Sequence, residues 1–459
     1  MKNNQGLDRL FNPDSIALIG VSKDERKTGG QFLKSLIKAS FKGKLYPVNP
    51  NASEIMGLKA YRSILDIPGE VDLAIITVPA RHVPPVMAEC SRKKVRFAVV
   101  HSAGFSELGE EGKALEAEML RYARQGGTRI IGPNCMGLYT PRARLNTIAF
   151  DSVIDYEPGS VAFVGQSGWA TENVILLGQE RGLRFSQVVS IGNQSDLTIE
   201  DLFRYFAEDK DTSVIAAYIE GIKRGREFLQ LAREISRKKP IVIWKGGRSE
   251  VGIRTAASHT GSLAGNNIVV DAALRQGGVV IARNLEELVD NLVGFASPFL
   301  PRGNKLGLLV EAGGSAVSSA DAAEALGLEL PTLSAATQQE LMNILEGKIP
   351  PFSRPKNPVD IVWSNTADLF TLCSQVMLKE VDALVIVNYE SYDEPFLREM
   401  ARVRDRAGKP IFIVPGHSIE RRSKMAALTQ NGLPTFTIPE RALMTIAAMA
   451  RYSNYRQSG

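Results

Sequence analysis

The sequence predicts an α/β protein built from three consecutive parallel α/β domains. Short apolar runs rich in β-branched residues alternate with longer segments of helical periodicity along most of the 459 residues. Many of these runs end in clusters of Gly, Pro, Asn or Ser, and strand–loop–helix repetition of this kind is typical of doubly wound sheets. The length is also sufficient for about three domains of ordinary size.

The first series of alternating elements ends near residue 150. Segments 30–39 and 110–125 have helical periodicity. The predicted strands are 15–20, 44–48, 73–78, 97–101 and 129–131. Ligands of doubly wound sheets bind at the carboxyl ends of the strands, so the loops after these runs are candidate binding loops.

Two further series follow, separated by a Pro- and Gly-containing linker near residue 300. The second series predicts strands at 160–164, 187–191, 214–219 and 240–245 and helices at 268–276 and 285–296. The third predicts strands at 305–310, 383–388, 410–414 and 435–438 and a last helix at 440–452. The expected domains are therefore 1–150, 151–300 and 301–459.

Composition and charge exclude several classes of function. The chain has 55 Lys and Arg against 50 Asp and Glu, a net charge of +5, and no basic stripe interleaved with aromatics, so we expect no nucleic-acid partner. No apolar run is long enough to span a membrane, and residues 1–10 lack the apolar core of a secretory signal. Cys90, Cys135 and Cys373 are far apart and lack metal-ligand spacing, which predicts a cytoplasmic protein without a metal site.

The loop after the first predicted strand does not match a nicotinamide-binding loop. Residues 20–30 lack G-x-G-x-x-G, and residues 46–50, at the end of the second strand, lack the acidic residue that binds the ribose of NAD. A nucleotide with a 3′-phosphate, such as coenzyme A, disfavours a carboxylate there because like charges repel. Ser22 and Lys23 are then candidate phosphate ligands, aided by N–H groups at the helix start. A loop without a ligand is the alternative.

His259 is the most informative residue of the chain. It lies among small and hydroxylic residues at 258–265, shortly after the basic segment 245–248. A histidine without bulky neighbours, beside glycines that allow close approach, is able to present its ring to a phosphate. A capping or core histidine in a Gly-rich turn is the alternative, and the residues around His259 do not by themselves exclude it.

Ten segments in register resemble the α subunit of the NDP-forming acyl-CoA synthetases, which are related to succinyl-CoA synthetase. The likeness covers nearly the whole chain. The segments are 11–22, 41–61, 71–80, 102–112, 131–139, 158–168, 218–228, 245–265, 311–317 and 357–361. The resemblance implies a Rossmann-like CoA-binding domain followed by two flavodoxin-like, succinyl-CoA synthetase-like domains.

The resemblance also implies a mechanism and a set of site residues. Acyl-CoA and phosphate give an acyl phosphate and CoA, the phosphoryl group passes to His259, and then to ADP. Glu220 matches the carboxylate that bonds this ring, although a surface carboxylate at a strand end is its alternative. The implied phosphate ligands, at two helix starts that are otherwise plain tight turns, are Ser167, Gly168, Gly313, Gly314 and Ser315. The implied CoA ligands are Gly20, Val21, Ser22, Lys23, Asn49, Val78, Pro79, Ser102, Ala103, Gly104 and Asn134.

The chain departs from the family pattern at two positions. Trp169 follows the Gln166-Ser167-Gly168 turn where many relatives have a small residue, which favours a substrate other than acetate. Ser315 replaces a residue that is often proline. Cys135 is interpreted as a small packing residue, because no His or Asp is near it in sequence.

No phosphate-binding loop of the G-x-x-x-x-G-K-[ST] type and no ATP-grasp segment is found in the sequence. We therefore expect a separate ATP-grasp β subunit that binds ADP or ATP with Mg²⁺, in an α2β2 assembly, with inorganic phosphate and a small carboxylic acid as further substrates. The competing hypothesis is a non-catalytic CoA-binding protein that regulates or scaffolds a partner. His259 and Glu220 favour the enzyme, because CoA binding needs neither residue.

Overall fold

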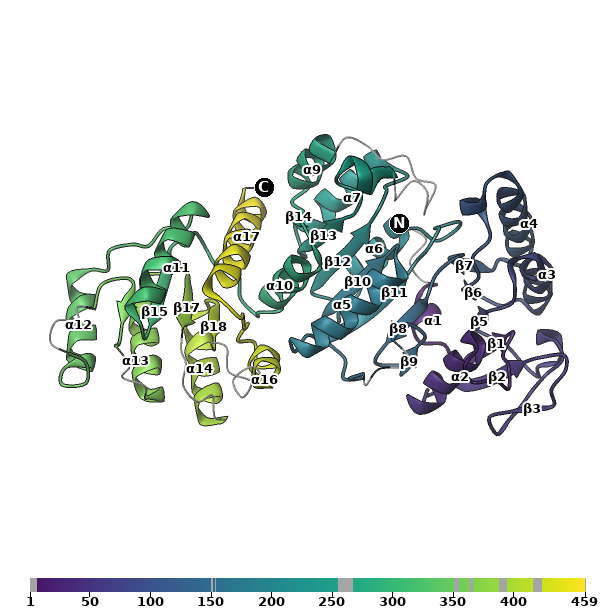
Figure 1. The fold of residues 1–459 in the computed structure, drawn as a ribbon, viewed down its shortest axis with the longest axis horizontal. Helices are drawn as coiled ribbons and strands as arrows, with labels where there is room; N and C mark the ends of the chain where they lie inside the picture. The colour runs from purple at the N-terminus through teal and green to yellow at the C-terminus, as the bar shows by residue number, and fades with distance from the viewer. Residues whose placement is uncertain are drawn as a thin grey trace. The chain divides into compact units, whose positions relative to one another are not determined.

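The computed structural model describes residues 6–149, 152, 154–254, 267–350, 355–362, 366–387, 394–415 and 423–458. The chain divides into two compact units. One comprises Met1–Leu176, Arg184–Ile235 and Ile243–Gly277, and the other comprises Leu177–Leu183, Ser236–Val242 and Gly278–Gly459. Helices flank mostly parallel sheets in both (Figure 1), which confirms the α/β class. The boundaries at residues 150 and 300 stay a prediction.

The first sheet has five parallel strands in the order β2-β1-β5-β6-β7. Its strands are β1 (Ser15–Ile19), β2 (Lys44–Val48), β5 (Leu73–Ile76), β6 (Phe97–Val100) and β7 (Arg129–Ile131), close to the predicted runs. The helices are α1 (Asp8–Phe11), α2 (Thr28–Lys38), α3 (Val83–Lys93) and α4 (Glu110–Gly126). Short elements are the hairpin β3 (Glu54–Ile55) and β4 (Leu58–Lys59), with η1 (Ile64–Asp66), η2 (Ala80–His82) and η3 (Ser106–Leu108).

Successive side chains of these strands point to opposite faces of the sheet, and helices cover the sheet. Ala17 and Ile19 point to the same face as Ala74 and Ile76, and this face packs on buried residues of α3 and α4 such as Met87. Figure 1 shows α3 and α4 side by side along the sheet. Both faces of a parallel sheet are buried in this way, so its strands are almost wholly apolar.

The second sheet has seven strands in the order β14-β13-β12-β10-β11-β8-β9. The strands are β8 (Gly137–Thr140), β9 (Leu145–Asn146), β10 (Val161–Gly165), β11 (Phe185–Ser190), β12 (Val214–Ile219), β13 (Ile241–Lys245) and β14 (Val280–Ala282). The helices are α5 (Gly168–Glu180), α6 (Ile199–Glu208), α7 (Gly225–Ser236), α9 (Asn267–Gln276) and α10 (Leu285–Phe295). β8 pairs antiparallel with both β11 and β9, an edge that the sequence analysis did not foresee.

The third sheet has the order β16-β15-β17-β18, and its neighbouring strands pair in parallel. Its strands are β15 (Leu306–Val310), β16 (Val359–Asp360), β17 (Ala383–Val387) and β18 (Ile411–Val414). The helices are α11 (Gly313–Ala325), α12 (Ala335–Leu345), α13 (Ala367–Met377), α14 (Glu394–Ala407), α16 (Met425–Gln430) and α17 (Pro439–Gln457).

The strand predicted at 435–438 is wrong. The segment makes one isolated bridge, between Thr435 and Ile413, because Pro439 at the first turn of α17 takes the chain into a helix directly afterwards. In the described part of the chain, no helix is both long and apolar enough to cross a membrane.

Candidate functional site

All three sheets place their predicted site residues at the same topological position. If the parallel strands of the first sheet are numbered in chain order, they lie side by side in the order 2-1-3-4-5. The 2-1-3 part of this order recurs in the second sheet, for β10, β11 and β12, and in the third sheet, for β15, β16 and β17. Successive connections leave opposite sides of the first strand, and a crevice opens beyond its carboxyl end, where ligands of such sheets bind. Gly20, Gln166 and Glu311 each follow that first strand.

At the first of these positions, Gly20, the backbone lies very close to residues at the end of β5. Gly20 has φ of +91°, and a Cβ atom there would lie 2.9 Å from Thr77 Oγ1 and 2.9 Å from Val78 Cγ1. Only glycine accepts both the left-handed conformation and this crowding without strain. The Asn49 side chain donates to the Val21 carbonyl oxygen at 2.6 Å. The loop after β1 is therefore fixed against the ends of β2 and β5.

Hydrogen bonds extend this arrangement to the ends of β6 and β7. The Ser102 hydroxyl donates to the Val78 carbonyl oxygen, and the Asn134 N–H donates to the Ser102 carbonyl oxygen at 2.9 Å. The Gly104 N–H donates to Glu107 Oε1 at 2.6 Å. The structure thus brings the predicted residues from five strand ends into one continuous rim.

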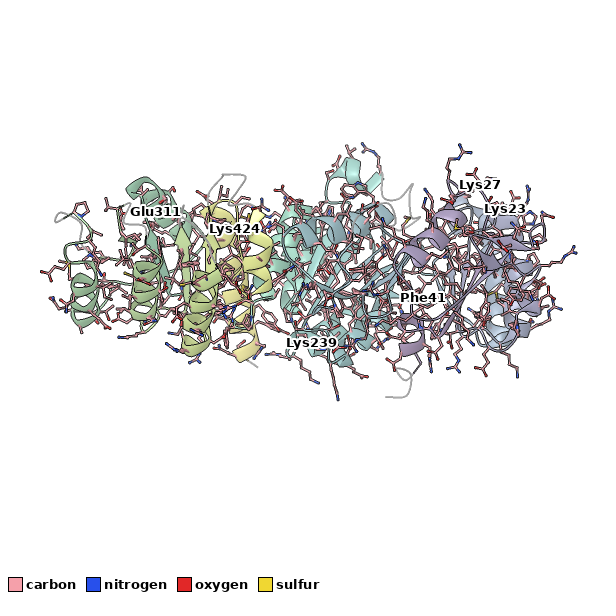
Figure 2. The ribbon with its side chains drawn as sticks, turned by 90° about the horizontal axis from the view of Figure 1, so that it is seen from below. Lys23, Lys27, Phe41, Lys239, Glu311 and Lys424 are labelled. Carbon is pink, nitrogen blue, oxygen red and sulfur yellow. The ribbon has the colours of Figure 1, made fainter. Side chains whose placement is uncertain are left out.

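Two lysines lie on the outer part of the β1–α2 loop. Lys23 and Lys27 are exposed and lie on the same side of the N-terminal domain (Figure 2). The acidic residues between them are already engaged, since Asp24 pairs with Arg26 at 3.0 Å and Glu25 with Lys34 at 2.7 Å. Neither Lys23 nor Lys27 forms an ion pair with any residue that the structure describes, so both charges remain available to an anion.

Replacement of Gly20 by alanine is expected to destabilise the protein by roughly 1–3 kcal/mol, the cost of a strained left-handed residue, and to weaken CoA binding at least ten-fold. Gly57→Ala is the matched control, because Gly57 has φ of +76° and a Cβ atom added there would meet nothing within 4 Å. Calorimetric titration with CoA and thermal unfolding measure the two effects. Equal loss of CoA affinity in both variants would contradict a binding role for this crowded position.

A cavity of about 330 Å³ is lined by residues that follow strands of the first and second sheets, and all of these residues belong to one unit. Its lining residues are His101, Ala103, Asn134, Cys135, Met136, Gln166, Ser167, Gly168, Trp169, Gly192 and Asn193. Ala103 and Asn134 were predicted as CoA ligands, and Ser167 and Gly168 as phosphate ligands. The sequence analysis missed His101, Met136, Gly192 and Asn193 as lining residues, because nothing in their local pattern marks them.

Asn193 joins the cavity to the rim described above. Its amide nitrogen donates to Glu107 Oε2 at 2.6 Å, and its Oδ1 accepts a weaker bond from the Asn134 side chain at 3.4 Å. The hydrogen bond from the Gly104 N–H and the bond from Asn193 lower the pKa of Glu107, although burial opposes them. Glu107 therefore stays ionised and holds one loop from each sheet.

Cys135 behaves as a packing residue, as the sequence indicated. Its thiol is buried against the Val100 carbonyl oxygen at 3.4 Å. Burial raises the pKa of Cys135 to about 12. A thiol in that state supplies almost no thiolate near neutral pH and is a poor nucleophile.

His101 is held as a neutral ring in the cavity wall. Its Nδ1 lies 2.8 Å from the Cys135 carbonyl oxygen, an acceptor that requires the proton on Nδ1, and its ring packs edge-on against Phe32 at 5.1 Å. Burial lowers the pKa of His101, and the bond to Cys135 opposes this shift only in part.

The depressed pKa of His101 predicts an acid-sensitive fold. As pH falls through about 6.5 an unfolded histidine gains a proton, whereas folded His101 gains it only at lower pH. The unfolded state then binds more protons, so stability is lost as pH falls below about 6.5. Unfolding midpoints at about pH 7.5 and about pH 5.5 should show a smaller acid loss in His101→Asn than in the wild type. An identical loss in the two proteins would refute this assignment.

Gln166 fixes the loop that carries Glu220. Its Oε1 accepts from the N–H groups of Glu220 and of Gly221, the latter at 3.2 Å, and its Nε2 donates to the Gly221 carbonyl oxygen at 3.0 Å. The side chain of one glutamine thus satisfies the backbone at the end of β12 from the end of the adjacent strand β10. Gln166 was not among the predicted site residues, although it lies within the predicted turn.

Glu220 is buried with one oxygen left open. Its exposed fraction is 7%, and Oε1 accepts from the Tyr218 hydroxyl at 3.2 Å. Oε2 is also buried and has no hydrogen-bond partner among the described residues. A buried polar atom without a partner is costly, so its retention calls for a functional explanation. Nearby, burial and Arg248 lower the pKa of Lys245, whereas Glu220 raises it.

The remaining predicted residues fall outside this cavity. His259 lies outside the described residues. Gly313, Gly314 and Ser315 begin α11 in the other unit, where the Ser315 hydroxyl donates to the Ala312 carbonyl oxygen at 2.7 Å. Gly313 and Gly314 are exposed at this helix start. In the described ranges, no three His, Cys, Asp or Glu side chains form a group that would hold a metal ion.

Two family models match the chain. Residues 14–141 match a CoA binding domain, and residues 158–294 match a succinyl-CoA ligase like flavodoxin domain. The α subunit of acetate–CoA ligase [ADP-forming] II from Pyrococcus furiosus is 39% identical over 447 residues, 95% of each chain. Acetate–CoA ligase [ADP-forming] I from Archaeoglobus fulgidus is 38% identical, over 97% of this chain but 64% of that protein.

A solved structure is similar along the same length. It is the dinucleotide forming acetyl-coenzyme A synthetase 1 from Ca. Korarchaeum cryptofilum, in complex with phosphate and ADP. The TM-score is 0.88 at 35% identity, and the match covers 98% of this chain and 97% of that one. The similarity therefore extends through all three sheets.

Proposed function

Because the chain belongs to the α subunits of the ADP-forming acetate–CoA ligase family, acid–thiol ligases and not regulatory CoA-binding modules, we propose that it interconverts acyl-CoA, ADP and phosphate with a carboxylic acid, CoA and ATP. A phosphate oxygen attacks the thioester carbonyl carbon, the C–S bond breaks, and CoA leaves as a thiol after taking a proton. A ring nitrogen of His259 then attacks the phosphorus, and the carboxylate leaves. ADP accepts the phosphoryl group from the histidine.

The open oxygen of Glu220 is the observation that carries this proposal. A carboxylate that is 7% exposed, at the switch point of a sheet, is poised to accept a hydrogen bond from an imidazole N–H. Such a bond fixes the tautomer of a histidine and leaves its other nitrogen nucleophilic. A protein that only binds CoA would gain nothing from burying this charge.

The first domain suits the chemistry of CoA. The crowded glycine at position 20 allows a phosphate or ribose to approach the backbone, and the N–H groups at the start of α2 point toward the same loop. Lys23 and Lys27 supply positive charge, and the end of β2 supplies no carboxylate that would repel a 3′-phosphate. We propose Gly20 to Lys23, Asn49, Val78, Pro79, Ser102 to Gly104 and Asn134 as its contacts.

Nucleotide chemistry is proposed to reside on a partner. The Pyrococcus relative of equal length is named as an α subunit, whereas the Archaeoglobus relative extends well beyond the matched region. We propose an ATP-grasp β subunit that supplies ADP or ATP with Mg²⁺, an α2β2 assembly, and phosphate contacts at the starts of α5 and α11. The three cysteines are buried and unpaired, which is compatible with the reducing cytoplasm that we propose as its location.

The chain and its candidate β subunit should be assayed together and separately. Together they are expected to form acyl-CoA from acid, CoA and ATP. The chain alone is expected to cleave acyl-CoA with arsenate, because the acyl arsenate that replaces the acyl phosphate hydrolyses and needs no nucleotide. ATP-dependent synthesis by the chain alone would refute the separate subunit. CoA binding without any thioester cleavage would refute the enzymatic proposal and favour a binding module.

A further inference from the structure

We infer that Trp169 selects the acyl group, and that the cavity beside α5 takes flat, uncharged acids larger than acetate. This inference rests on the proposed function, because it names the substrate class of the same site.

The cavity wall is uncharged. Of the residues that line it within the described ranges, none is Asp, Glu, Lys or Arg, and burial lowers the pKa of His101, which favours its neutral form. A second carboxylate on the acyl group would lose its hydration here without gaining an ionic partner, which is costly. The wall therefore disfavours dicarboxylic acids and leaves uncharged acyl groups.

The Trp169 ring offers an unused apolar surface to this cavity. It is 62% exposed at the second residue of α5, although tryptophan is usually well buried. Aromatic groups bind one another by offset stacking or edge-to-face contact, so a planar ring on the acyl group has a partner here. A methyl group alone would cover little of the indole.

The Trp169 indole contacts a row of other aromatic rings. Trp169 meets Trp244 edge-to-face with centroids 6.5 Å apart, and Trp244 meets Tyr218 in the same way at 4.6 Å. Tyr218 in turn donates to Glu220. The row of rings thus runs from the acyl cavity to the proposed ring-orienting carboxylate, with Trp169 at its cavity end.

Size and neighbours agree with a ring-bearing acid. A volume of about 330 Å³ lies within the range of small-molecule pockets, about 300–1,000 Å³. Met136 forms the wall opposite the first turn of α5, since a Cβ atom on Gly168 would lie 2.6 Å from its Cγ. Methionine adapts its shape and makes favourable contacts with aromatic edges. Ser167, Gly168 and Trp169 line the same cavity, so an acyl group against the indole lies next to the proposed phosphate.

Arsenolysis of three thioesters tests the inference, because it needs neither nucleotide nor β subunit. The wild type is expected to cleave phenylacetyl-CoA with a kcat/KM at least ten-fold above that for acetyl-CoA, and succinyl-CoA more slowly than either. Trp169→Ala should lower kcat/KM for phenylacetyl-CoA at least ten-fold and change acetyl-CoA less than about three-fold. Ten-fold corresponds to about 1.4 kcal/mol.

Matched variants separate a specific contact from a general defect. Trp169→Phe keeps a ring and should retain most of the phenylacetyl-CoA activity, and Met444→Ala removes an exposed apolar side chain from α17 and should leave both activities unchanged. Wild-type preference for acetyl-CoA, or equal losses for both thioesters in Trp169→Ala, would overturn the inference alone. Cleavage of no thioester by the wild type would overturn the proposed function and the inference with it.

Discussion

Replacing His259 by alanine is expected to abolish covalent phosphorylation of the chain. With the β subunit, Mg²⁺ and ATP labelled in the γ-phosphate, the wild type should acquire an acid-labile, base-stable label, which is the signature of a phosphohistidine. ATP-dependent acyl-CoA synthesis should fall by on the order of 10³-fold or more, because loss of a covalent nucleophile removes the route and not merely a contact.

The same variant should keep the first half of the reaction. Arsenolysis of acyl-CoA requires the thioester, the anion and the cavity, but not the histidine, so His259→Ala is expected to retain it within a few-fold. His82→Ala is the control, since His82 is exposed and does not line the cavity. A wild type that never acquires the label, or a label that persists in His259→Ala, would contradict the proposed mechanism.

A second large effect, on stability, is expected from a buried ionic network around Asp290. Asp290 of α10 lies 2.9 Å from Arg181 and 2.6 Å from Arg441 of α17, and all three residues belong to the same unit. The Arg181 and Asp290 side chains are 8% and 7% exposed. Arg181 also donates to the Thr435 carbonyl oxygen at 2.5 Å and lies over the Phe436 ring.

Asp290→Asn is expected to destabilise this unit by about 3–5 kcal/mol, because it leaves the buried Arg181 charge without its ion-pair partner. The unfolding midpoint should fall by roughly 6–20 °C. Differential scanning calorimetry measures the change.

Glu340→Gln provides the comparison. Glu340 pairs with Lys379 at 2.7 Å, but the two side chains are 47% and 56% exposed, and exposed pairs contribute at most about 1 kcal/mol. Its midpoint should therefore stay within about 4 °C of the wild type. Equal shifts in the two variants would show that burial is not what makes the Asp290 network important.

Local sequence patterns predicted most elements well, for identifiable reasons. β15 and β17 are short, fully buried apolar runs bounded by turn residues, and the two strands lie within a residue of their predicted positions. The antiparallel strands β8 and β9 were missed because they follow β7 closely and their four- and two-residue lengths leave no periodicity to detect. The segment 435–438 was overpredicted because its residues favour a strand, whereas Pro439 commits the chain to α17.

The residues of the candidate site were likewise predictable only in part. Gly20 and the turn at Gln166, Ser167 and Gly168 were identifiable from sequence, because backbone that must approach an anion closely selects glycine and helix starts. His101 and Asn193 were not, because each enters the cavity through contacts with residues more than thirty positions away, Cys135 and Glu107 respectively.

The sequence by itself determined the α/β class, the likeness to a CoA-dependent ligase and the candidate histidine, since these depend on short-range order and on motifs. Tertiary structure decided which strand ends become neighbours. Strand order places β10 beside β12, so that Gln166 fixes the backbone of Glu220 across 54 residues and one oxygen of this carboxylate remains open. Which side chains become buried and which strand ends become neighbours depend on the strand order of the folded chain. Local hydrophobic periodicity does not determine that order.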